Sequence, residues 1–281
     1  MIREVNVKEI TENIKEMCIE ANYTLSPDMD KAMKKAAEEE KSELGTKILN
    51  QLQENLVIAD SEKIPICQDT GMAVVFVDIG QEIHFTGGQL EEAIHEGVRQ
   101  GYTEGYLRKS VVKDPIERVN TKDNPPAIIH YNIVPGEKIK ITVAPKGFGS
   151  ENMSRVFMLK PADGIEGVKN AVLTAVKDAG PNACPPMVVG VGVGGTFEKC
   201  AILAKKALAR PADSSSTIPY VKEMEEELLT KINKLGIGPG GLGGTQTALA
   251  VNVETYPTHI AGLPVAINIC CHVNRHVTRT I

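Results

Sequence analysis

The stretch ICQDTGMAVVFVDI, residues 66–79, marks the point where the chain changes from a helical to a β pattern. Before it, residues 7–56 repeat apolar side chains every three to four positions, as amphipathic helices do. Within it, the β-branched run over residues 72–79 predicts a strand, and the preceding Asp-Thr-Gly predicts a turn. Helices and strands then follow in mixed order without strict alternation. This order favours an α+β fold over a doubly wound parallel sheet.

The same patterns predict the remaining elements. We expect helices at residues 89–104, 164–179, 195–208 and 219–235, and strands at 127–134, 138–143, 187–193, 245–254 and 263–269. The turn Pro135-Gly136-Glu137 predicts that the strands on either side of it form a hairpin. No repeat or linker divides the chain. We therefore expect one mixed domain over residues 1–281, with a helical N-terminal part and β-sheets flanked by helices.

Composition excludes several classes of function. The chain has 281 residues and a net charge of −5, whereas nucleic-acid binding needs a surplus of Lys and Arg on one face. Aromatic residues are only 4% and Trp is absent, so the core is expected to be aliphatic. No apolar run is long enough for a membrane span, and the start lacks the apolar core of a signal peptide. We expect a cytoplasmic protein.

Three of the six cysteines have unusual neighbours. Cys67 precedes Gln-Asp-Thr-Gly, Cys184 precedes two prolines, and Cys271 stands between Cys270 and His272. They are too far apart for a local zinc knuckle, so only a folded scaffold could bring them to one centre. Iron–sulfur clusters are held by thiolates, normally four, and three thiolates leave one iron open as a Lewis acid. Cys18 and Cys200 lie in helical patterns and are predicted to be core thiols.

The glycine-rich stretches do not predict nucleotide binding. Residues 190–195, GVGVGG, follow a strand and precede a helix, but no recognisable acidic partner follows about twenty residues later. A phosphate-binding Gly-Lys-Ser/Thr is also missing from the sequence. The run over residues 236–244 is interpreted as a place where the backbone approaches a ligand or another chain closely.

Several polar residues could complete a site, and each has a simpler alternative. Asp69 could relay a proton or make an Asx turn with Gly71. Arg108 could clamp a carboxylate or be a surface arginine. The segment 147–152, GFGSEN, could offer backbone amides and the Asn152 side chain to an anion. His259 could transfer protons or be a core histidine.

Five ordered segments together resemble class I fumarate hydratase, and more narrowly its alpha subunit or N-terminal domain. These segments are residues 67–71, 146–152, 184–186, 258–261 and 271–276, and the resemblance extends from about Val5 to His276. It implies an iron–sulfur hydro-lyase of the tricarboxylic acid cycle that hydrates fumarate reversibly to L-malate. It also implies a [4Fe-4S] cluster held by Cys67, Cys184 and Cys271. Cys271 is preferred to Cys270 because the family's ligand stands twelve residues after its active-site histidine, here His259.

The resemblance also assigns roles around the cluster. Asp69 and His259 would be catalytic, with His259 reaching the site of a neighbouring protomer. The substrate, a small dicarboxylate, would be bound by Gln68, Asp69, Arg108, Gly149 and Asn152. Single-chain members of the family continue into a second domain with further catalytic residues, whereas this chain stops at Ile281. We therefore expect a separate beta subunit and a heterotetramer, with part of the interface at residues 236–244 and the C-terminus.

Three alternatives remain. The alpha subunit of L(+)-tartrate dehydratase carries the same cluster motifs. A non-catalytic iron–sulfur electron carrier would need a fourth thiolate, for which Cys270 is the neighbour. A redox switch formed by a Cys270–Cys271 disulfide is disfavoured, because bridges between adjacent cysteines are strained.

Overall fold

The computed structural model describes residues 2–281, and these residues group into two compact units. Unit 1 contains the described residues through Ser26, together with Ile58–Gly147 and Arg275–Ile281. Unit 2 contains Pro27–Val57 and Phe148–Asn274. Each unit is thus built from segments that are distant in the sequence. The expectation that residues 1–281 form one domain stays a prediction, because a division into two compact units does not test it.

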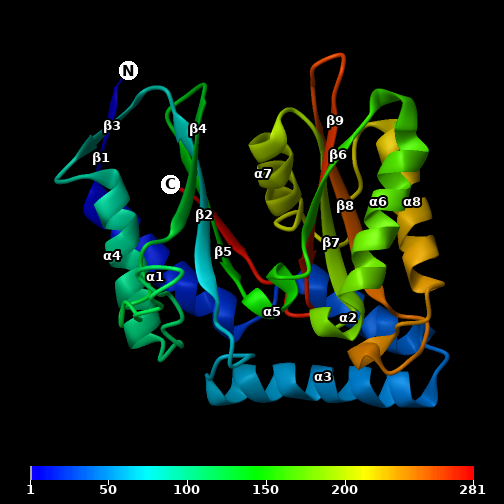
Figure 1. The fold of residues 1–281 in the computed structure, drawn as a ribbon. Helices are drawn as coiled ribbons and strands as arrows, with labels where there is room; N and C mark the ends of the chain where they lie inside the picture. Colours follow the sequence, from blue (N-terminus) through cyan, green and yellow to red (C-terminus); the bar gives the residue numbers. More distant parts are fainter. Residues whose placement is uncertain (1) are drawn as a thin grey trace. The chain divides into compact units, whose positions relative to one another are not determined.

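Unit 1 is a four-stranded mixed sheet with two helices on one face (Figure 1). Its sheet has the order β10-β5-β2-β4, and β1 and β3 form a separate parallel pair. Alternate side chains of β2, namely Ala73, Val75 and Val77, pack with both helices in a hydrophobic core. The elements of unit 1 are β1 (Arg3–Asn6), α1 (Val7–Tyr23), β2 (Met72–Gly80), β3 (Ile83–Thr86), α4 (Leu90–Glu104), β4 (Ile128–Val134), β5 (Ile139–Lys146) and β10 (Val277–Thr280).

The predicted hairpin of residues 127–134 with 138–143 is wrong. β4 and β5 do not pair with each other, because β2 lies between them, parallel to β4 and antiparallel to β5. The turn at Gly136 instead wraps around the end of β2, where the Gly80 N–H donates to the Lys138 carbonyl at 2.8 Å. A Cβ on Gly80 would lie only 2.3 Å from the Gly136 carbonyl oxygen, so this wrapping needs a glycine. The long apolar β2 gains two partners by this insertion.

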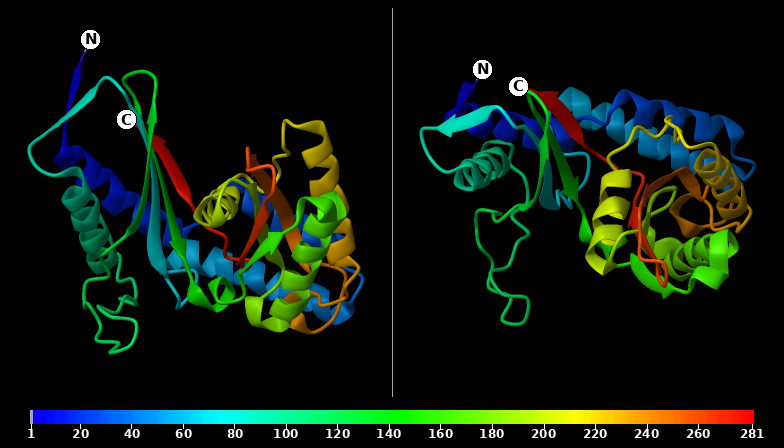
Figure 2. Two further views of the ribbon diagram at one scale, coloured as in Figure 1. Left: turned by 45° about the horizontal axis from the view of Figure 1, so that its top comes forward. Right: turned by 90° about the horizontal axis from the view of Figure 1, so that it is seen from above.

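Unit 2 is a sandwich of three layers around a second mixed sheet, of order β6-β9-β7-β8. Helices α6 and α8 lie side by side on one face and α7 covers the other (Figures 1 and 2). Its elements are α2 (Pro27–Glu39), α5 (Phe148–Glu151), β6 (Arg155–Leu159), α6 (Gly164–Ala179), β7 (Met187–Gly194), α7 (Phe197–Ala207), α8 (Pro219–Asn233), β8 (Ala248–Tyr256) and β9 (Leu263–Cys270). Helix α3 (Glu43–Glu62) runs from unit 2 into unit 1.

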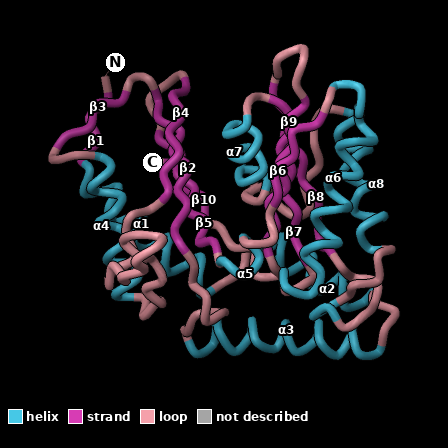
Figure 3. Tube along the Cα trace, viewed as in Figure 1, coloured by secondary structure: helices cyan, strands magenta, loops and turns pink. Residues whose placement is uncertain are grey.

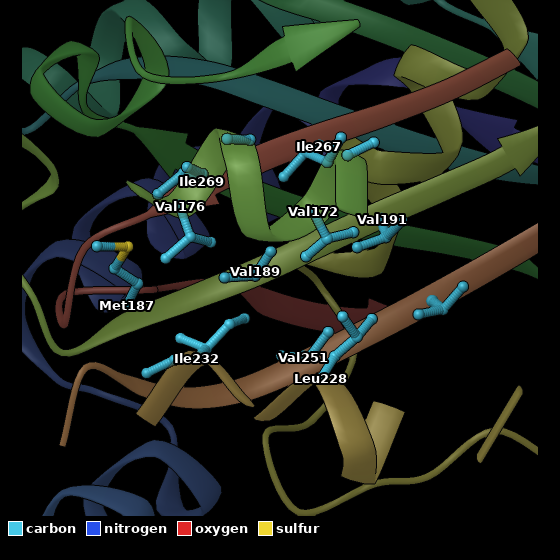
Figure 4. Packing of buried hydrophobic residues seen from close by; sticks show 14 of the residues in the cluster. Val172, Val176, Met187, Val189, Val191, Leu228, Ile232, Val251, Ile267 and Ile269 are labelled. Atoms are coloured by element: carbon cyan, nitrogen blue, oxygen red, sulfur yellow. The ribbon is translucent and has the colours of Figure 1, made fainter. Parts of the chain in front are cut away.

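Strand β7 explains the layering of unit 2. Val189 and Val191 point into the large core shared with α6 and α8, which Figure 4 shows from close by. The residues that alternate with these valines, Gly190 and Gly192, face the other side of the sheet, and α7 packs directly on them. A Cβ on Gly192 would lie 2.0 Å from the Cys200 carbonyl oxygen. The glycines that superficially resemble a nucleotide fingerprint therefore serve the close approach of a helix to a strand.

The α+β class is confirmed. Both four-stranded sheets mix parallel and antiparallel pairs, and the helices pack on their faces (Figure 3). The residues preceding β2 are mainly helical, as predicted, in α1, α2 and α3. Within residues 2–281, no helix is both long enough and apolar enough to cross a membrane.

Candidate active site

In unit 1, the candidate site centres on the loop Cys67–Gly71, which precedes β2. Asp69 Oδ1 accepts a hydrogen bond from the Gly71 N–H at 3.1 Å, so the Asx turn is present. That bond orients the carboxylate. The other carboxylate oxygen, Oδ2, lies close to Gly147, where an added Cβ would be only 2.9 Å away. Beside it, the Cys67 thiol contacts Gln68 Oε1 at 3.3 Å. Cys67 and Asp69 are half-buried and Gln68 is exposed, so these side chains can reach a ligand.

The same loop positions Arg108. The Thr70 hydroxyl accepts the Arg108 N–H at 2.9 Å and lies 3.2 Å from the Arg108 carbonyl oxygen. Thr70 is buried, whereas Arg108 is exposed. A buried hydroxyl thus fixes the backbone of an arginine whose guanidinium is accessible. Gln68, Asp69 and Arg108, all predicted from the resemblance, are brought together in unit 1.

Two buried residues without a sequence prediction support this loop. The Tyr102 hydroxyl lies 2.7 Å from the Thr70 carbonyl oxygen and 3.2 Å from that of Gly71. Asn124 Nδ2 donates to the Gly71 carbonyl at 3.2 Å, and its Oδ1 accepts the Ser110 N–H at 2.6 Å. Both side chains are fully buried. Asn124 stands directly before Pro125-Pro126, which is the only sequence signal that marked it.

In unit 2, the structure brings two of the three predicted ligand segments together. The Cys184 carbonyl oxygen lies 3.1 Å from His272 Nδ1 and accepts the His272 backbone N–H at 3.5 Å. Cys184 follows the 3₁₀ turn Gly180–Ala183 and has a φ of 52°, in the left-handed region that a non-glycine residue rarely occupies. Such backbone strain is found mainly at functional sites.

The glycine run packs on this Cys184 loop. The Gly240 N–H donates to the Pro185 carbonyl at 2.8 Å, and a Cβ on Gly241 would lie 2.2 Å from Pro181 Cβ. The close backbone approach predicted for residues 236–244 is therefore made to the chain's own ligand loop. The subunit interface expected there stays a prediction.

Glu40 anchors the end of the glycine run. Its carboxylate is 9% exposed and accepts backbone N–H groups of Ser42, Thr245 and Gln246, each at 2.8–2.9 Å. Burial alone would raise the pKa of Glu40, but these hydrogen bonds outweigh it and hold the pKa below its usual range. A Cβ on Gly244 would lie 2.8 Å from this carboxylate. No sequence pattern pointed to Glu40.

The segment 148–152 is held by a polar network of unit 2. The Glu151 carboxylate accepts a hydrogen bond from Lys205 Nζ and another from Asn268 Nδ2, the latter at 2.8 Å. Because Asn268 belongs to β9, this network ties α5 to the strand that ends at Cys270. Gly149 and Asn152 are both exposed beside it. A Cβ on Gly149 would meet no other atom, so its surface is open to a ligand.

His259 lies at the opposite end of β9 from Cys271. It is exposed in the turn between β8 and β9, and its Nδ1 accepts the Ala261 N–H at 3.2 Å. The interpretation of His259 as a core residue is wrong. It lines an apolar pocket of about 470 Å³ with Tyr220 and Ile260. Cys271 follows the opposite end of β9, roughly 25 Å away at the usual rise per strand residue.

Burial divides the six cysteines into two groups. Cys18, Cys200 and Cys270 are buried, whereas Cys67 and Cys271 are half-buried and Cys184 is exposed. Burial raises the pKa of Cys18 to about 12 and raises that of Cys200, so the prediction of inert core thiols is confirmed. None of the six forms a disulfide, Cys270 and Cys271 included. The three accessible thiols are those that the resemblance assigns to the cluster.

These accessible thiols match the donor chemistry of an iron–sulfur cluster, which takes thiolate ligands. Cys184 and Cys271 belong to adjoining segments of unit 2, and Cys67 belongs to unit 1. Across residues 2–281, no three His, Cys, Asp or Glu side chains are gathered as a metal site. Unit 2 thus contains two of the three predicted ligands.

Comparison with known proteins identifies similar chains. The family model described as fumarate hydratase (Fumerase) matches residues 11–280. A Methanocaldococcus jannaschii protein, provisionally named L(+)-tartrate dehydratase subunit alpha, is 42% identical over 279 residues, covering 97% of this chain and 98% of the relative. The L(+)-tartrate dehydratase subunit alpha of Escherichia coli K12 is 30% identical over 288 residues, covering 99% of this chain and 94% of the relative.

Proposed function

The chain belongs to the fumarate hydratase family, and on that basis we propose that it is the alpha subunit of an iron–sulfur hydro-lyase. The observation that carries the proposal is the family match over residues 11–280, joined with relatives named as alpha subunits of a dehydratase. Hydro-lyases remove a hydroxyl and a neighbouring proton from their substrate. The accessible thiols and the polar loop of unit 1 would supply part of what such a reaction needs, and a beta subunit would supply the rest.

Cys67, Cys184 and Cys271 would hold a [4Fe-4S] cluster. Support comes from their accessibility, from the burial of the other three thiols, and from the contact between the Cys184 and His272 segments. When bound by three thiolates, the cluster supplies an open iron that acts as a Lewis acid. Cys270 is 4% exposed and lies within β9, which supports Cys271 as the third ligand.

The chain's own residues would bind and orient the substrate. Arg108 would hold a carboxylate through its planar guanidinium, since its backbone is fixed by Thr70 and its side chain is accessible. Asp69 would relay a proton during the reaction, and the Gly71 N–H orients its carboxylate. Gln68, Gly149 and Asn152 would add hydrogen bonds. His259 would serve a neighbouring copy of the chain.

We propose L(+)-tartrate as the substrate, in place of the fumarate and L-malate favoured from the sequence. The support is that the relatives are named for L(+)-tartrate. The description of the family model keeps fumarate and L-malate as the second candidate. Both reactions use a hydroxy dicarboxylate, so the groups described above suit either.

The names of the relatives also support a beta subunit, as "subunit alpha" presupposes a partner in those proteins. A heterotetramer and a cytoplasmic location stay predictions. An electron carrier is less well supported, because the buried Cys270 is poorly placed as a fourth ligand.

The test is an anaerobic assay of this chain co-purified with its beta subunit and loaded with iron and sulfide. We expect turnover of L(+)-tartrate well above that of L-malate or fumarate, and none by either subunit alone. Turnover of L-malate and fumarate but not of L(+)-tartrate would reject the proposal that L(+)-tartrate is the substrate. Turnover of none of the three, with a cluster present, would reject the hydro-lyase proposal.

A further inference from the structure

Arg275 is a buried cation that the proposed reaction does not use. It opens the C-terminal segment of unit 1, just before β10, and only 4% of it is exposed. Burying a guanidinium is costly unless several of its N–H groups find acceptors and its charge is compensated. The contacts of Arg275 should therefore explain why a charged side chain is buried at this position.

The contacts of Arg275 lead to the Cys67–Gly71 loop. Its Nη2 donates a hydrogen bond to the backbone carbonyl of Asp69. Its Nε and Nη1 are buried and find no acceptor among residues 2–281. Since one bond to a neutral carbonyl does not compensate a buried charge, Arg275 contributes little net stability to the ligand-free chain.

Tyr102 supports the neighbouring part of the same loop. Its hydroxyl contacts the carbonyl oxygens of Thr70 and Gly71, and Arg275 holds that of Asp69. Burial raises the pKa of Tyr102, and the charge of Arg275 acts in the opposite direction, which places the two side chains close together. Three successive carbonyl groups of the loop are thus held from its buried side.

We propose that Arg275 is a positioning residue that holds the Asp69 backbone and so sets the direction of the Cys67 and Asp69 side chains. The bond is made to the Asp69 carbonyl, so a shift of that peptide would move the Asp69 side chain and disturb the loop that carries Cys67. The expected effect of losing Arg275 on turnover rests on the proposed hydro-lyase activity. The expected effect on the conformation of the Cys67–Gly71 loop does not.

The first test measures the loop in the ligand-free chain by amide hydrogen exchange. In Arg275→Met, we expect faster exchange over residues 66–72, while exchange over residues 181–186 of unit 2 stays unchanged. Arg275→Lys, which keeps a donor and the charge, should restore most of the protection. The control is Arg279→Met, which removes an arginine of β10 that pairs with Glu16 and Glu20 at the surface.

Thermal unfolding separates positioning from general stabilisation. Because the buried charge is poorly compensated, we expect the Tm of Arg275→Met to equal or exceed that of the wild type. A large fall in Tm, with faster exchange throughout unit 1, would make Arg275 a structural residue and overturn the proposal. Wild-type exchange at residues 66–72 in Arg275→Met would overturn it as well.

The second test uses the loaded complex. A displacement of Asp69 by about 1 Å should lower kcat about 100-fold with a smaller change in KM. Arg275→Lys should recover part of kcat. A wild-type kcat in Arg275→Met would overturn the positioning role. If the wild-type complex itself is inactive, the proposed function fails, and the exchange experiment still decides the role of Arg275.

Discussion

At the scale of single residues, accessibility separates the three cysteines proposed as cluster ligands from the other three. Cys67, Cys184 and Cys271 reach the surface, and Cys18, Cys200 and Cys270 lie in cores. The neighbours of Cys67 and Cys184 in the sequence already marked them as unusual. The choice between Cys271 and Cys270 rested on the resemblance, and the burial of Cys270 at the end of β9 supports it.

We expect Cys67→Ala, Cys184→Ala and Cys271→Ala each to lose the cluster, because two thiolates do not retain it. Cys270→Ala should keep it, since that thiol is a packed neighbour. The measurements are iron and sulfide per chain and the visible absorbance after anaerobic reconstitution. A full cluster in Cys271→Ala would contradict the ligand assignment.

Arg108 gives a prediction on substrate affinity. Arg108→Lys keeps the charge but loses the planar pair of donors, so KM for the dicarboxylate should rise by about tenfold or more. The matched control is Arg118→Lys, another exposed arginine of the same long loop. An equal rise of KM in both variants would point to a general charge effect and against a carboxylate clamp.

At the scale of elements, local patterns predicted most helices but not the strand order. Periods of 3.6 and 2 are properties of one segment, so they identified α6 and β2 closely. The partner of a strand depends on distant segments, and β2 therefore separates β4 from β5 against expectation. The four-residue strands β1, β3 and β10 are too short to show a period.

Glu40 gives a prediction on stability. Glu40→Gln replaces an acceptor oxygen by an NH₂ group that faces backbone N–H donors, so it should lower the free energy of unfolding by about 2–3 kcal/mol. Urea unfolding of the chain at neutral pH measures this. Glu39→Gln, at an exposed pair with Lys35, should cost less than about 0.5 kcal/mol.

The same carboxylate predicts a dependence on pH. Its pKa in the folded chain is below the ordinary value of 4.5, so its stabilising effect is complete above 4.5 and is lost as the pH falls through the folded value. The difference in unfolding free energy between wild type and Glu40→Gln should therefore shrink in acid. A difference that stays constant below pH 4.5 would show that Glu40 does not titrate with folding.

At the scale of the whole molecule, the position of His259 bears on assembly. His259 and Cys271 follow opposite ends of the same strand in unit 2, so one rigid copy of that unit does not bring them together. If His259 acts in catalysis, a second copy of the chain must supply it.

Mixing two inactive variants tests this. Complexes of His259→Ala and of Cys184→Ala, exchanged into mixed assemblies, should regain about a quarter of wild-type activity, because half of the pairs are mixed and each has one complete site. Unmixed samples are the control. No recovery after verified exchange would mean that His259 acts within its own copy, and full activity of unmixed His259→Ala would mean that it has no catalytic role.

The sequence by itself determined the secondary structure of the long segments and the α+β class, since these depend on local periodicity and residue type. Only the tertiary structure decided which thiols are accessible, that the glycine run packs on the Cys184 loop, and that Glu40 and Arg275 hold distant backbone segments. The physical reason is that these contacts join segments far apart in the sequence. A buried carboxylate or guanidinium acts on whatever backbone folding brings to it, some 200 residues away in both cases, and no local pattern encodes that partner.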